Sequence, residues 1–537
     1  MKKLLFSVAV IGVFFSCQQQ KKADLIVINA NAYTVNANFG MAESFAIKDG
    51  KFIAVGTTKD IQQKYATLKT IDAKNQTVVP GLIDAHCHFF GMGLQQQKVD
   101  LRGTKSYDEV LERLVAFQKE KNTEFITGRG WDQNDWEVKE FPTKEKLDKL
   151  FPNAPVAVRR VGGHALLVNQ AAINLSKLTK NTKVSGGEII LKDGKITGVL
   201  VDAAMRFINI PQPSKKEQIQ ALLDAQKISF DLGLTTVDDA GLSRQTIELI
   251  DSLQKSGDLK MRIYAMVSVS DQNLDHYISK GITKTDRLNV RSFKVYGDGA
   301  LGSRGAAMKK PYSDRENHHG ALIYAPGKYR EIATRIAASN YQMNTHAIGD
   351  SANFWLLKTY KEALKGQKNR RWRIEHAQII APEDFEYFDN IIPSVQPTHA
   401  TSDMYWAKDR VGEKRIKGAY AFKDLLNTYG KIALGTDFPV EKVSPFLTFY
   451  AAVVRKDLDN YPENGFQMEN ALTREETLKG MTIWAAYSNF EEHEKGSIEV
   501  GKFADFVILN QDIMEVESAE IPHTKVVATY VNGEKMK

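Results

Sequence analysis

Short apolar runs recur along most of the chain and alternate with longer stretches in which polar residues are frequent. Eight of these runs have the length and composition of buried strands, and they cover residues 82–86, 235–239, 261–267, 292–296, 342–346, 372–376, 391–396 and 432–437. The stretches between them are long enough for helices, which is the pattern of parallel strands joined by helical crossovers. Eight such units predict an α/β fold built on a TIM-type barrel.

Both ends of the chain show a different pattern, in which strand-like runs are joined by tight turns. Asp49-Gly50 separates two such runs near the start, and this pair favours a hairpin turn. Residues 504–509 and 525–531 have the same character near the other end. Because chain termini often lie close together, we expect one small β-sandwich domain built from both ends. The predicted boundaries are 24–80 plus 495–537 for this composite β-domain and 81–494 for the barrel.

The connection between the first and second predicted barrel strands is far longer than one helix requires. Long connections without structure of their own are uncommon, so we expect an inserted subdomain at about residues 125–210. Residues 188–198 fit this expectation, because Asp193-Gly194 lies between two strand-like halves and favours a hairpin turn.

The first residues have the features of an export signal. Lys2 and Lys3 precede a twelve-residue apolar run, 4–15, which is too short to span a bilayer as a mature helix. Ser16-Cys17 follows, and this resembles the lipobox of bacterial lipoproteins, although Phe14 departs from the usual leucine. The sequence predicts a signal peptide over residues 1–16, lipidation of Cys17, a polar tether at 17–23 and a place on the periplasmic side of the cell envelope. The alternative is a simple cleaved signal peptide, which also predicts export.

Composition narrows the range of partners. The chain has 537 residues, of which 43% are hydrophobic and 26% charged, as in ordinary globular proteins. Its formal net charge of +7 is small for this length and no long Lys/Arg run occurs, so we expect no nucleic-acid partner. The expected partners are a small-molecule substrate and the membrane, through the lipid anchor, and the sequence leaves a homodimer open. If Cys17 is acylated, Cys87 has no partner for an intrachain disulfide.

Metal-ligand types of side chain stand at the carboxyl ends of five of the predicted strands. In the stretch GLIDAHCHFF, His86 and His88 are one residue apart, so they point to the same side of an extended strand. Later strands end in the same types of residue, namely Lys294, His346, His376 and Asp437. The carboxyl ends of barrel strands meet at one mouth, where imidazole nitrogens and a carboxylate can share a metal ion.

Several longer motifs accompany these residues in a fixed order. They include PGLIDAHCH, GRGWDQNDW, GGHALLVN, FKVYGDGALGSRGA, THAIGDSAN, RIEHAQ, SVQPTHATSD, LGTDFPVEKVSPF and GSIEVGKFADFVIL. From about residue 24 to 535 the sequence resembles the amidohydrolase superfamily, in the branch called amidohydrolase family 3. The resemblance implies a distorted (β/α)8 barrel plus a β-domain from both termini.

The resemblance also implies the metal ligands. His86 and His88 are expected to bind the more buried divalent ion, with Asp437 contacting that ion or its water. His346 and His376 are expected to bind a second ion. Lys294 would bridge the two ions if its amine is carboxylated, because a free ammonium has no lone pair. The alternative is that Lys294 is a structural or substrate-facing cation and that the site holds one ion. The expected metal is Zn²⁺.

Further residues are assigned catalytic or supporting roles. Asp437 is expected to act as the general base, and His399 to donate to a developing oxyanion. Three residues are expected to shape the substrate pocket, namely His164, Trp131 and Arg304, although a packing role for Trp131 and an ordinary core or surface role for His164 stay open. Two carboxylates are expected to orient metal-binding imidazoles, namely Asp298 and Asp350, although helix capping is an equal alternative for Asp350.

These expectations together predict a metal-dependent hydrolase that cleaves a C–N bond of an amide, N-formyl, N-acyl or cyclic amide substrate. A deaminase that works with one metal on the same scaffold is the first alternative. The second is a ligand-binding lipoprotein without catalysis, which is disfavoured because all six metal-type positions are filled.

Overall fold

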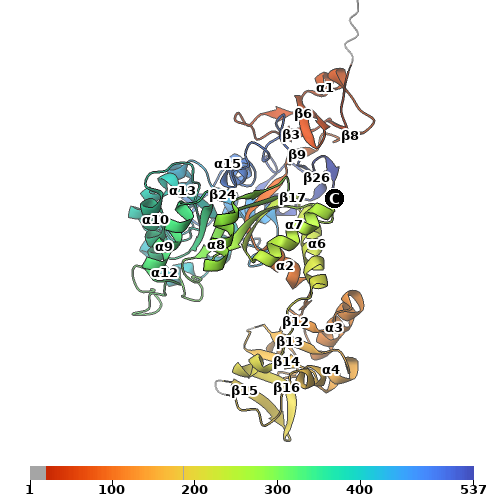
Figure 1. Cartoon of the computed structure of the whole chain (residues 1–537), viewed down its shortest axis with the longest axis vertical. Coiled ribbons are helices and arrows are strands. Elements are labelled where there is room, and N and C mark those ends of the chain that lie inside the picture. The colour runs from red at the N-terminus through yellow and green to blue at the C-terminus, as the bar shows by residue number, and fades with distance from the viewer. Residues whose placement is uncertain (1–19, 162, 185–186) are drawn as a thin grey trace, which may run out of the picture.

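Eight parallel strands form the centre of the structure, a computed structural model that describes residues 20–161, 163–184 and 187–537. Each predicted barrel strand is present, and neighbouring strands follow one another in sequence order, which confirms the α/β barrel. In Figure 1 helices lie outside this sheet. The strands are β10 (Leu82–Cys87), β17 (Leu234–Leu242), β18 (Arg262–Ser268), β20 (Leu288–Tyr296), β21 (Gln342–Ala347), β22 (Arg373–His376), β23 (Ile392–Val395) and β24 (Ala433–Leu434).

The last barrel strand is shorter than the sequence predicts, and a loop completes the closure beside it. The prediction covered residues 432–437, but only Ala433 and Leu434 pair with β23. The chain then approaches β10, where the backbone N–H of Asp437 donates to the carbonyl of His86 at 2.8 Å. The N–H of His88 donates to the carbonyl of Phe438 at 2.8 Å. Backbone hydrogen bonds of the candidate metal ligands therefore connect β10 to the loop after β24.

Helices surround the barrel and pack closely on one another. A β-carbon on Gly93 would lie 2.0 Å from the carbonyl oxygen of Ala221, so only glycine allows α2 and α6 to approach at their backbones. The α-helices of this region are α2 (Phe89–Gln95), α6 (Lys215–Asp231), α7 (Arg244–Ser256), α8 (Asp271–Lys280), α9 (Pro326–Ala337), α10 (Asp350–Leu364), α11 (Pro397–Asp403), α12 (Ala407–Arg415), α13 (Phe422–Tyr429), α14 (Pro445–Val454), α15 (Arg474–Gly480) and α16 (Ile483–Ser488). Smaller elements are β19 (Thr283–Lys284), η3 (Pro382–Asn390), η4 (Ile416–Gly418) and η5 (Met468–Asn470).

Two further sheets combine strands from both ends of the chain. In the larger sheet β9 pairs with β25 in antiparallel orientation, with Pro80 opposite Phe506. Phe45 of the smaller sheet packs against Phe506 with ring centroids 5.0 Å apart. The larger sheet contains β27 (Glu534–Lys535), β26 (Val526–Val531), β25 (Phe506–Leu509), β9 (Thr77–Pro80), β3 (Asn31–Tyr33) and β4 (Met41–Ala42), and the smaller contains β6 (Lys51–Gly56), β5 (Ser44–Lys48), β2 (Leu25–Ile28) and β8 (Thr70–Asp72). Beside them lie β1 (Lys21–Lys22), α1 (Thr58–Lys64), β7 (Tyr65–Ala66) and η6 (Ser518–His523).

A buried ion pair joins this β-region to the barrel. The guanidinium of Arg262, on β18, donates from Nε and Nη2 to the two carboxylate oxygens of Asp505 at 2.6 and 3.0 Å. Asp505 directly precedes β25, and both side chains are almost fully buried. A bidentate ion pair of this kind fixes the relative orientation of the two side chains as well as the distance between them.

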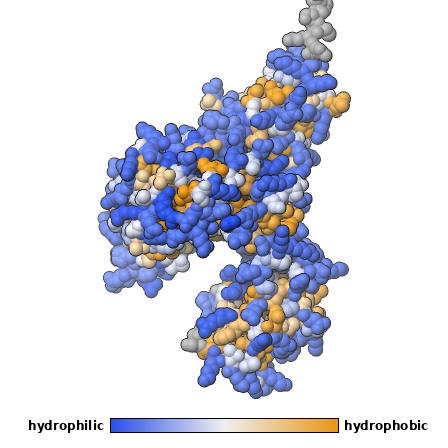
Figure 2. Space-filling model, viewed as in Figure 1, coloured by the Kyte–Doolittle hydropathy of each residue, from blue (hydrophilic) through white to orange (hydrophobic). Residues whose placement is uncertain are grey.

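A separate sheet forms between β10 and β17 in the sequence. Figure 1 shows it projecting from one end of the barrel, and Figure 2 shows an open notch between the two. The sheet begins at Val99, earlier than the predicted start near residue 125, because β11 pairs in parallel with β12. Its strands are β11 (Val99–Asp100), β12 (Ile126–Trp131), β13 (Val156–Arg160), β14 (Ala165–Val168), β16 (Lys195–Asp202) and β15 (Gly187–Lys192), accompanied by α3 (Tyr107–Lys121), α4 (Glu145–Leu150), α5 (Gln170–Leu175), η1 (Gln133–Asp135) and η2 (Ala203–Phe207).

The predicted hairpin in this sheet has the conformation that its turn residues favour. Asp193 and Gly194 join β15 to β16 with positive φ angles of 51° and 72°. The expected signal peptide and Cys17 lie outside the described residues. None of the helices in the described part of the chain has both the length and the apolar content that crossing a bilayer requires.

Candidate metal centre

Five histidines and one aspartate gather at the carboxyl ends of the barrel strands. His86 lies in β10, His346 in β21 and His376 at the end of β22. Ring centroids of His86 and His376 are 4.8 Å apart, and those of His346 and His376 are 4.5 Å apart. His88 follows β10, and His399 lies in α11, which directly follows β23. The structure therefore brings together imidazoles that are distant in sequence.

Asp437 lies at the centre of this group. Its Oδ1 atom is 3.2 Å from Nε2 of His88 and 3.8 Å from Nε2 of His86. Its other oxygen, Oδ2, is 3.6 Å from Nε2 of His399. One carboxylate thus contacts histidines on both sides of the barrel mouth.

Hydrogen bonds orient the imidazoles that face Asp437. Nδ1–H of His88 donates to the carbonyl oxygen of Ala240 at 2.9 Å, and Nδ1–H of His86 donates to Oε2 of Glu375 at 2.5 Å. A carbonyl or an ionised carboxylate only accepts, so in both rings the proton is on Nδ1 and Nε2 keeps its lone pair. Such second partners are typical of metal-binding histidines.

The side chains present fit a divalent metal. Two groups place nitrogen and oxygen atoms within 4.8 Å of one another, namely His86, His88 and Asp437, and His376, His399 and Asp437. Among the described residues, Oδ1 of Asp437 and Nε2 of His399 are buried without a hydrogen-bond partner, which is costly unless another ligand satisfies them. Imidazole and carboxylate are preferred ligands of zinc, and the carboxylate is shared between the two groups.

His376 has two imidazole neighbours at the barrel mouth. The ring of His346, its expected partner for the second ion, lies 4.5 Å away between centroids, and that of His399 lies 5.9 Å away. His399 also belongs with His376 and Asp437 to one of the two groups above. Nε2 of His346 faces Asp298, with 3.7 Å between Nε2 and Oδ1. Lys294 lies inside the cluster, where its Nζ donates to Nε2 of His86 at 3.0 Å.

Burial keeps three of these imidazoles neutral. Burial, assisted by the charge of Lys294, lowers the pKa of His86 to about 4 and that of His346 to about 3. The pKa of His376 is also lowered far below its usual value, mainly by burial. Neutral imidazoles have the lone pair that metal binding requires. Burial likewise lowers the pKa of Lys294 to about 8, so about a tenth of this amine is neutral at pH 7.

Asp437 stays ionised in the same surroundings. Burial acts to raise its pKa, but the close contact with His88 and the polar surroundings formed by the other imidazoles outweigh that effect and hold the pKa well below its usual range. The residue has a left-handed backbone conformation, with φ of 60°. Non-glycine residues keep this conformation only where the surrounding structure fixes it, which is frequent at functional sites.

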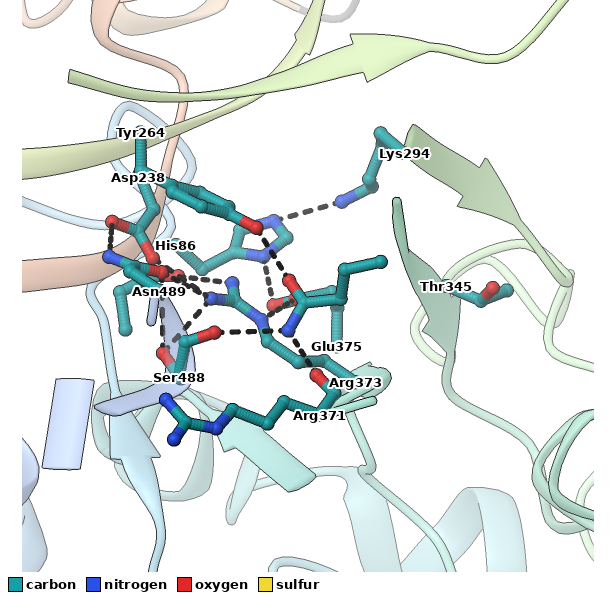
Figure 3. A network of polar contacts seen from close by, with 12 residues as sticks. His86, Asp238, Tyr264, Lys294, Thr345, Arg371, Arg373, Glu375, Ser488 and Asn489 are labelled. Atoms are coloured by element: carbon teal, nitrogen blue, oxygen red, sulfur yellow. Dashed lines mark hydrogen bonds and ion pairs between the residues drawn. The ribbon is translucent and has the colours of Figure 1, made fainter. Parts of the chain in front are cut away.

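A buried network below the histidines was not anticipated from the sequence. Figure 3 shows His86 between Lys294 and Glu375, with Arg373 on the other side of Glu375. Nε of Arg373 donates to Oε1 of Glu375 at 2.7 Å. Arg373 and Glu375 alternate with apolar or histidine neighbours in β22, and their spacing of two residues in a buried strand was the signal that could have revealed them. A charged residue in such a strand needs a partner.

The two carboxylates expected to support the imidazoles have different surroundings. Asp298 accepts from the backbone N–H groups of Ile348, Gly349 and Ala307 at 2.8–3.0 Å and lies near His346. Burial raises the pKa of Asp298 to about 7. Asp350 opens α10 and accepts from the N–H of Lys309 at 2.8 Å. Asp298 thus fixes the loops beside an imidazole, whereas Asp350 fixes a loop to a helix end.

The three residues expected in the substrate pocket have different surroundings in the described structure. The structure contradicts a pocket-lining role for Trp131, because its indole is buried in the core of the inserted sheet. Its Nε1–H donates to the carbonyl of Val158 at 2.9 Å. His164 is exposed on that sheet and donates from Nδ1 to Asp202 at 2.7 Å. Arg304 forms a two-pronged ion pair with Asp314, at 2.7 and 3.0 Å, in the loops after β20.

Known proteins resemble the chain over most of its length. The model of the "Amidohydrolase family" matches residues 69–535. "Protein LONG AFTER FAR-RED 3" of Arabidopsis thaliana is 32% identical, over 96% of this chain and 91% of its own. "N-substituted formamide deformylase" of Arthrobacter pascens is 24% identical, over 95% of this chain and 97% of its own.

Solved structures agree with this result. The crystal structure of an uncharacterized metal-dependent hydrolase from Pyrococcus furiosus superposes with a TM-score of 0.77 and 27% sequence identity, covering 91% of this chain and all of the other. The histidine and aspartate groups at the barrel mouth consist of side chains that could bind a divalent metal. By sequence and by fold, the chain belongs to the amidohydrolase family of metal-dependent hydrolases.

Proposed function

We propose that this chain hydrolyses a C–N bond of an N-formyl, N-acyl or cyclic amide substrate at a zinc centre. The observation that carries the proposal is the position of Asp437, whose two carboxylate oxygens lie 3.2 Å from His88 and 3.6 Å from His399. The similarity to a protein named N-substituted formamide deformylase, at 24% identity, supports a substrate of this class.

His86, His88 and Asp437 would hold one ion, and His376 and His346 would contribute to a second. A divalent ion bound there lowers the pKa of a water molecule from about 15.7 toward 7 and polarises a carbonyl group. Lys294 would join both sites if its amine is carboxylated. Its burial supports this, because only a neutral amine reacts with carbon dioxide and burial lowers the pKa of Lys294 to about 8.

Asp437 performs the proton transfers in this proposal. Its carboxylate is ionised, so it can accept a proton from the attacking water while the oxygen of that water bonds to the carbonyl carbon. It then delivers that proton to the leaving nitrogen as the C–N bond breaks, which gives an amine and a carboxylic acid. His399 lies on the other side of the carboxylate and would donate from Nε2–H to the carbonyl oxygen as negative charge develops there.

The test is a metal and substrate assay on the purified chain. N-substituted formamides, N-acyl amino acids and lactams are offered with zinc, and amine and acid products are quantified. We expect activity that is lost on chelation and restored by zinc. Release of ammonia from a ring substrate, without cleavage of any amide, would favour a deaminase. Tight zinc binding without turnover of any substrate would contradict the hydrolase proposal.

We also propose that the chain is exported and anchored through Cys17, on the basis of the signal-like residues 1–16. Expression of the whole chain in bacteria tests this. Labelled fatty acid should enter the wild-type protein and be absent from Cys17→Ser, and the variant should leave the membrane fraction. Equal membrane association of both proteins would contradict the anchor.

A further inference from the structure

A column of buried polar groups runs through the barrel interior and ends at His86 (Figure 3). At its base is Arg373, whose guanidinium is fully buried. Nη1 donates to Oδ2 of Asp238 at 2.9 Å, to Oγ of Ser488 at 3.1 Å and to Oδ1 of Asn489 at 3.1 Å. Nη2 donates to the carbonyl of Ala85 at 2.7 Å. These acceptors come from β17, β10 and the end of α16, so the guanidinium cannot turn without breaking contacts to several elements.

Glu375 links the fixed guanidinium of Arg373 to His86. Its Oε1 accepts from Nε of Arg373 at 2.7 Å, and its Oε2 accepts from Nδ1 of His86 at 2.5 Å. Both carboxylate oxygens are therefore used, one by the anchored guanidinium and the other by the imidazole. Both side chains of the Glu375–His86 pair are inaccessible to solvent, so water does not compete for these bonds.

The consequence appears on the opposite edge of the imidazole ring. Since Nδ1 carries the proton, Nε2 has a lone pair, and this atom faces Nζ of Lys294 at 3.0 Å and Oδ1 of Asp437 at 3.8 Å. The ring plane and the tautomer are both set by the bond to Glu375. A rotated ring, or a ring with its proton on Nε2, would have no lone pair directed to the metal centre.

We propose that Glu375 is a positioning residue for the metal centre, which holds His86 as the Nδ1–H tautomer and is itself held by Arg373. This inference rests on the zinc centre of the proposed function. It differs from a packing role, because a packing role needs only the shape of the side chain, whereas a positioning role needs two acceptor oxygens.

Glu375→Gln separates these two roles. Glutamine has nearly the same shape but one acceptor oxygen and one donor nitrogen, so it cannot accept from both Arg373 and His86. If the amide oxygen stays with Arg373, the amide nitrogen meets Nδ1 of His86 and favours the tautomer with its proton on Nε2. The lone pair for the metal would then be lost.

The matched control is Glu491→Gln. Glu491 is also a buried carboxylate with two cationic partners, Lys495 at 2.8 Å and Lys284 at 3.0 Å, and it contacts none of the six metal-type residues by any described ion pair. Both variants should lose thermal stability, because each removes a charge from a buried ion pair. Only Glu375→Gln should alter the metal centre.

Zinc affinity is measured by competition with a chelator, and the ligand geometry by the absorption spectrum of the cobalt-loaded protein. We expect Glu375→Gln to bind zinc about 10–100-fold more weakly and to change the cobalt spectrum. Glu491→Gln should match the wild type in both measurements. Equal zinc affinity in Glu375→Gln and the wild type would overturn the proposal.

A second measurement does not depend on whether Glu375→Gln folds. In metal-free wild-type protein labelled with ¹⁵N-histidine, the signal lost in His86→Gln should show a proton on Nδ1 and a lone pair on Nε2. The opposite tautomer would overturn the proposal. A wild-type protein that binds no zinc would instead contradict the proposed function, so the two failures are distinguishable.

Discussion

Nε2 of His88 lies 3.2 Å from Oδ1 of Asp437, although the two residues come from opposite ends of the barrel sequence. The backbone reinforces this pairing, because the N–H of Asp437 donates to the carbonyl of His86 at 2.8 Å. Closing the barrel and assembling the candidate site are therefore the same structural event. A change that loosens the junction between β10 and residue 437 should affect both.

Replacing Asp437 by asparagine should remove the proton acceptor and keep most of the shape of the side chain. We expect kcat to fall at least about 100-fold, since that is the lower range for loss of a general base. Zinc content should fall less than activity, because His86 and His88 remain. Steady-state kinetics and metal analysis check this, with Glu441→Gln as a control, whose carboxylate accepts from Ser402 instead. Turnover near the wild-type rate would remove Asp437 from the role of base.

Replacing His399 by alanine should remove a donor to the developing oxyanion. We expect kcat to fall by about 10²–10³ with a smaller change in KM, because such a donor acts mainly in the transition state. The zinc content should stay at the wild-type level. Loss of one zinc per chain would instead assign His399 to the ligands, as its grouping with His376 and Asp437 allows.

Lys294 should carry a carbamate when carbon dioxide is supplied. Its amine is buried and has a pKa lowered to about 8 by that burial, so the reactive neutral form is available. Incubation with ¹³C-bicarbonate and zinc should give a carbamate carbon signal that is absent from Lys294→Met. Lys495→Met is the matched control, because Lys495 is equally buried but pairs with Glu491. A signal that persists in Lys294→Met would place the carbamate elsewhere.

The ion pair between Arg262 and Asp505 should make stability depend on pH. Burial acts to raise the pKa of Asp505, but Arg262 outweighs it and the folded-state pKa is lowered. A carboxylate with a lowered pKa stabilises the fold fully above its unfolded-state pKa of about 3.9, and this contribution is lost as the pH falls through the folded-state value. We expect Asp505→Asn to cost about 3–5 kcal/mol of unfolding free energy at pH 7.

Urea denaturation of both proteins from pH 7 to pH 3 checks this prediction. The difference in unfolding free energy should be constant down to about pH 5 and should narrow below about pH 4. A difference that widens as the pH falls would contradict the prediction, because protonated Asp505 would then contribute more to the unfolding free energy than ionised Asp505. A negligible difference at pH 7 would show that the pair does not hold the β-region to the barrel.

The barrel could be predicted because each strand carries its own signal. Apolar runs such as 261–267 are local in sequence, and the eight of them fix the parallel sheet. The histidines at strand ends could also be placed at one mouth, since the fold alone brings those ends together. The hairpin at Asp193-Gly194 was predictable for a similar reason, because two adjacent residues determine the turn.

Features that depend on distant contacts could not be read in this way. Glu375 contacts His86 across 289 positions of sequence, and the residues around either one do not indicate that the two are in contact. The approach of both His346 and His399 to His376 depends on ring orientations that a strand pattern does not contain. Trp131 stands in a motif with polar neighbours, yet its indole completes the core of the inserted sheet.

The pairing of β9 with β25 determines the order in which this molecule can be completed during synthesis. Thr77–Pro80 leaves the ribosome early, but its antiparallel neighbour Phe506–Leu509 is translated only after the entire barrel. The early strand must wait with an unpaired edge, which is a hazard for association with other nascent chains. Deleting about the last thirty residues would therefore expose the edge of β9, near the start of the chain. Chaperones would then be expected to bind at β9 rather than at the new C-terminus.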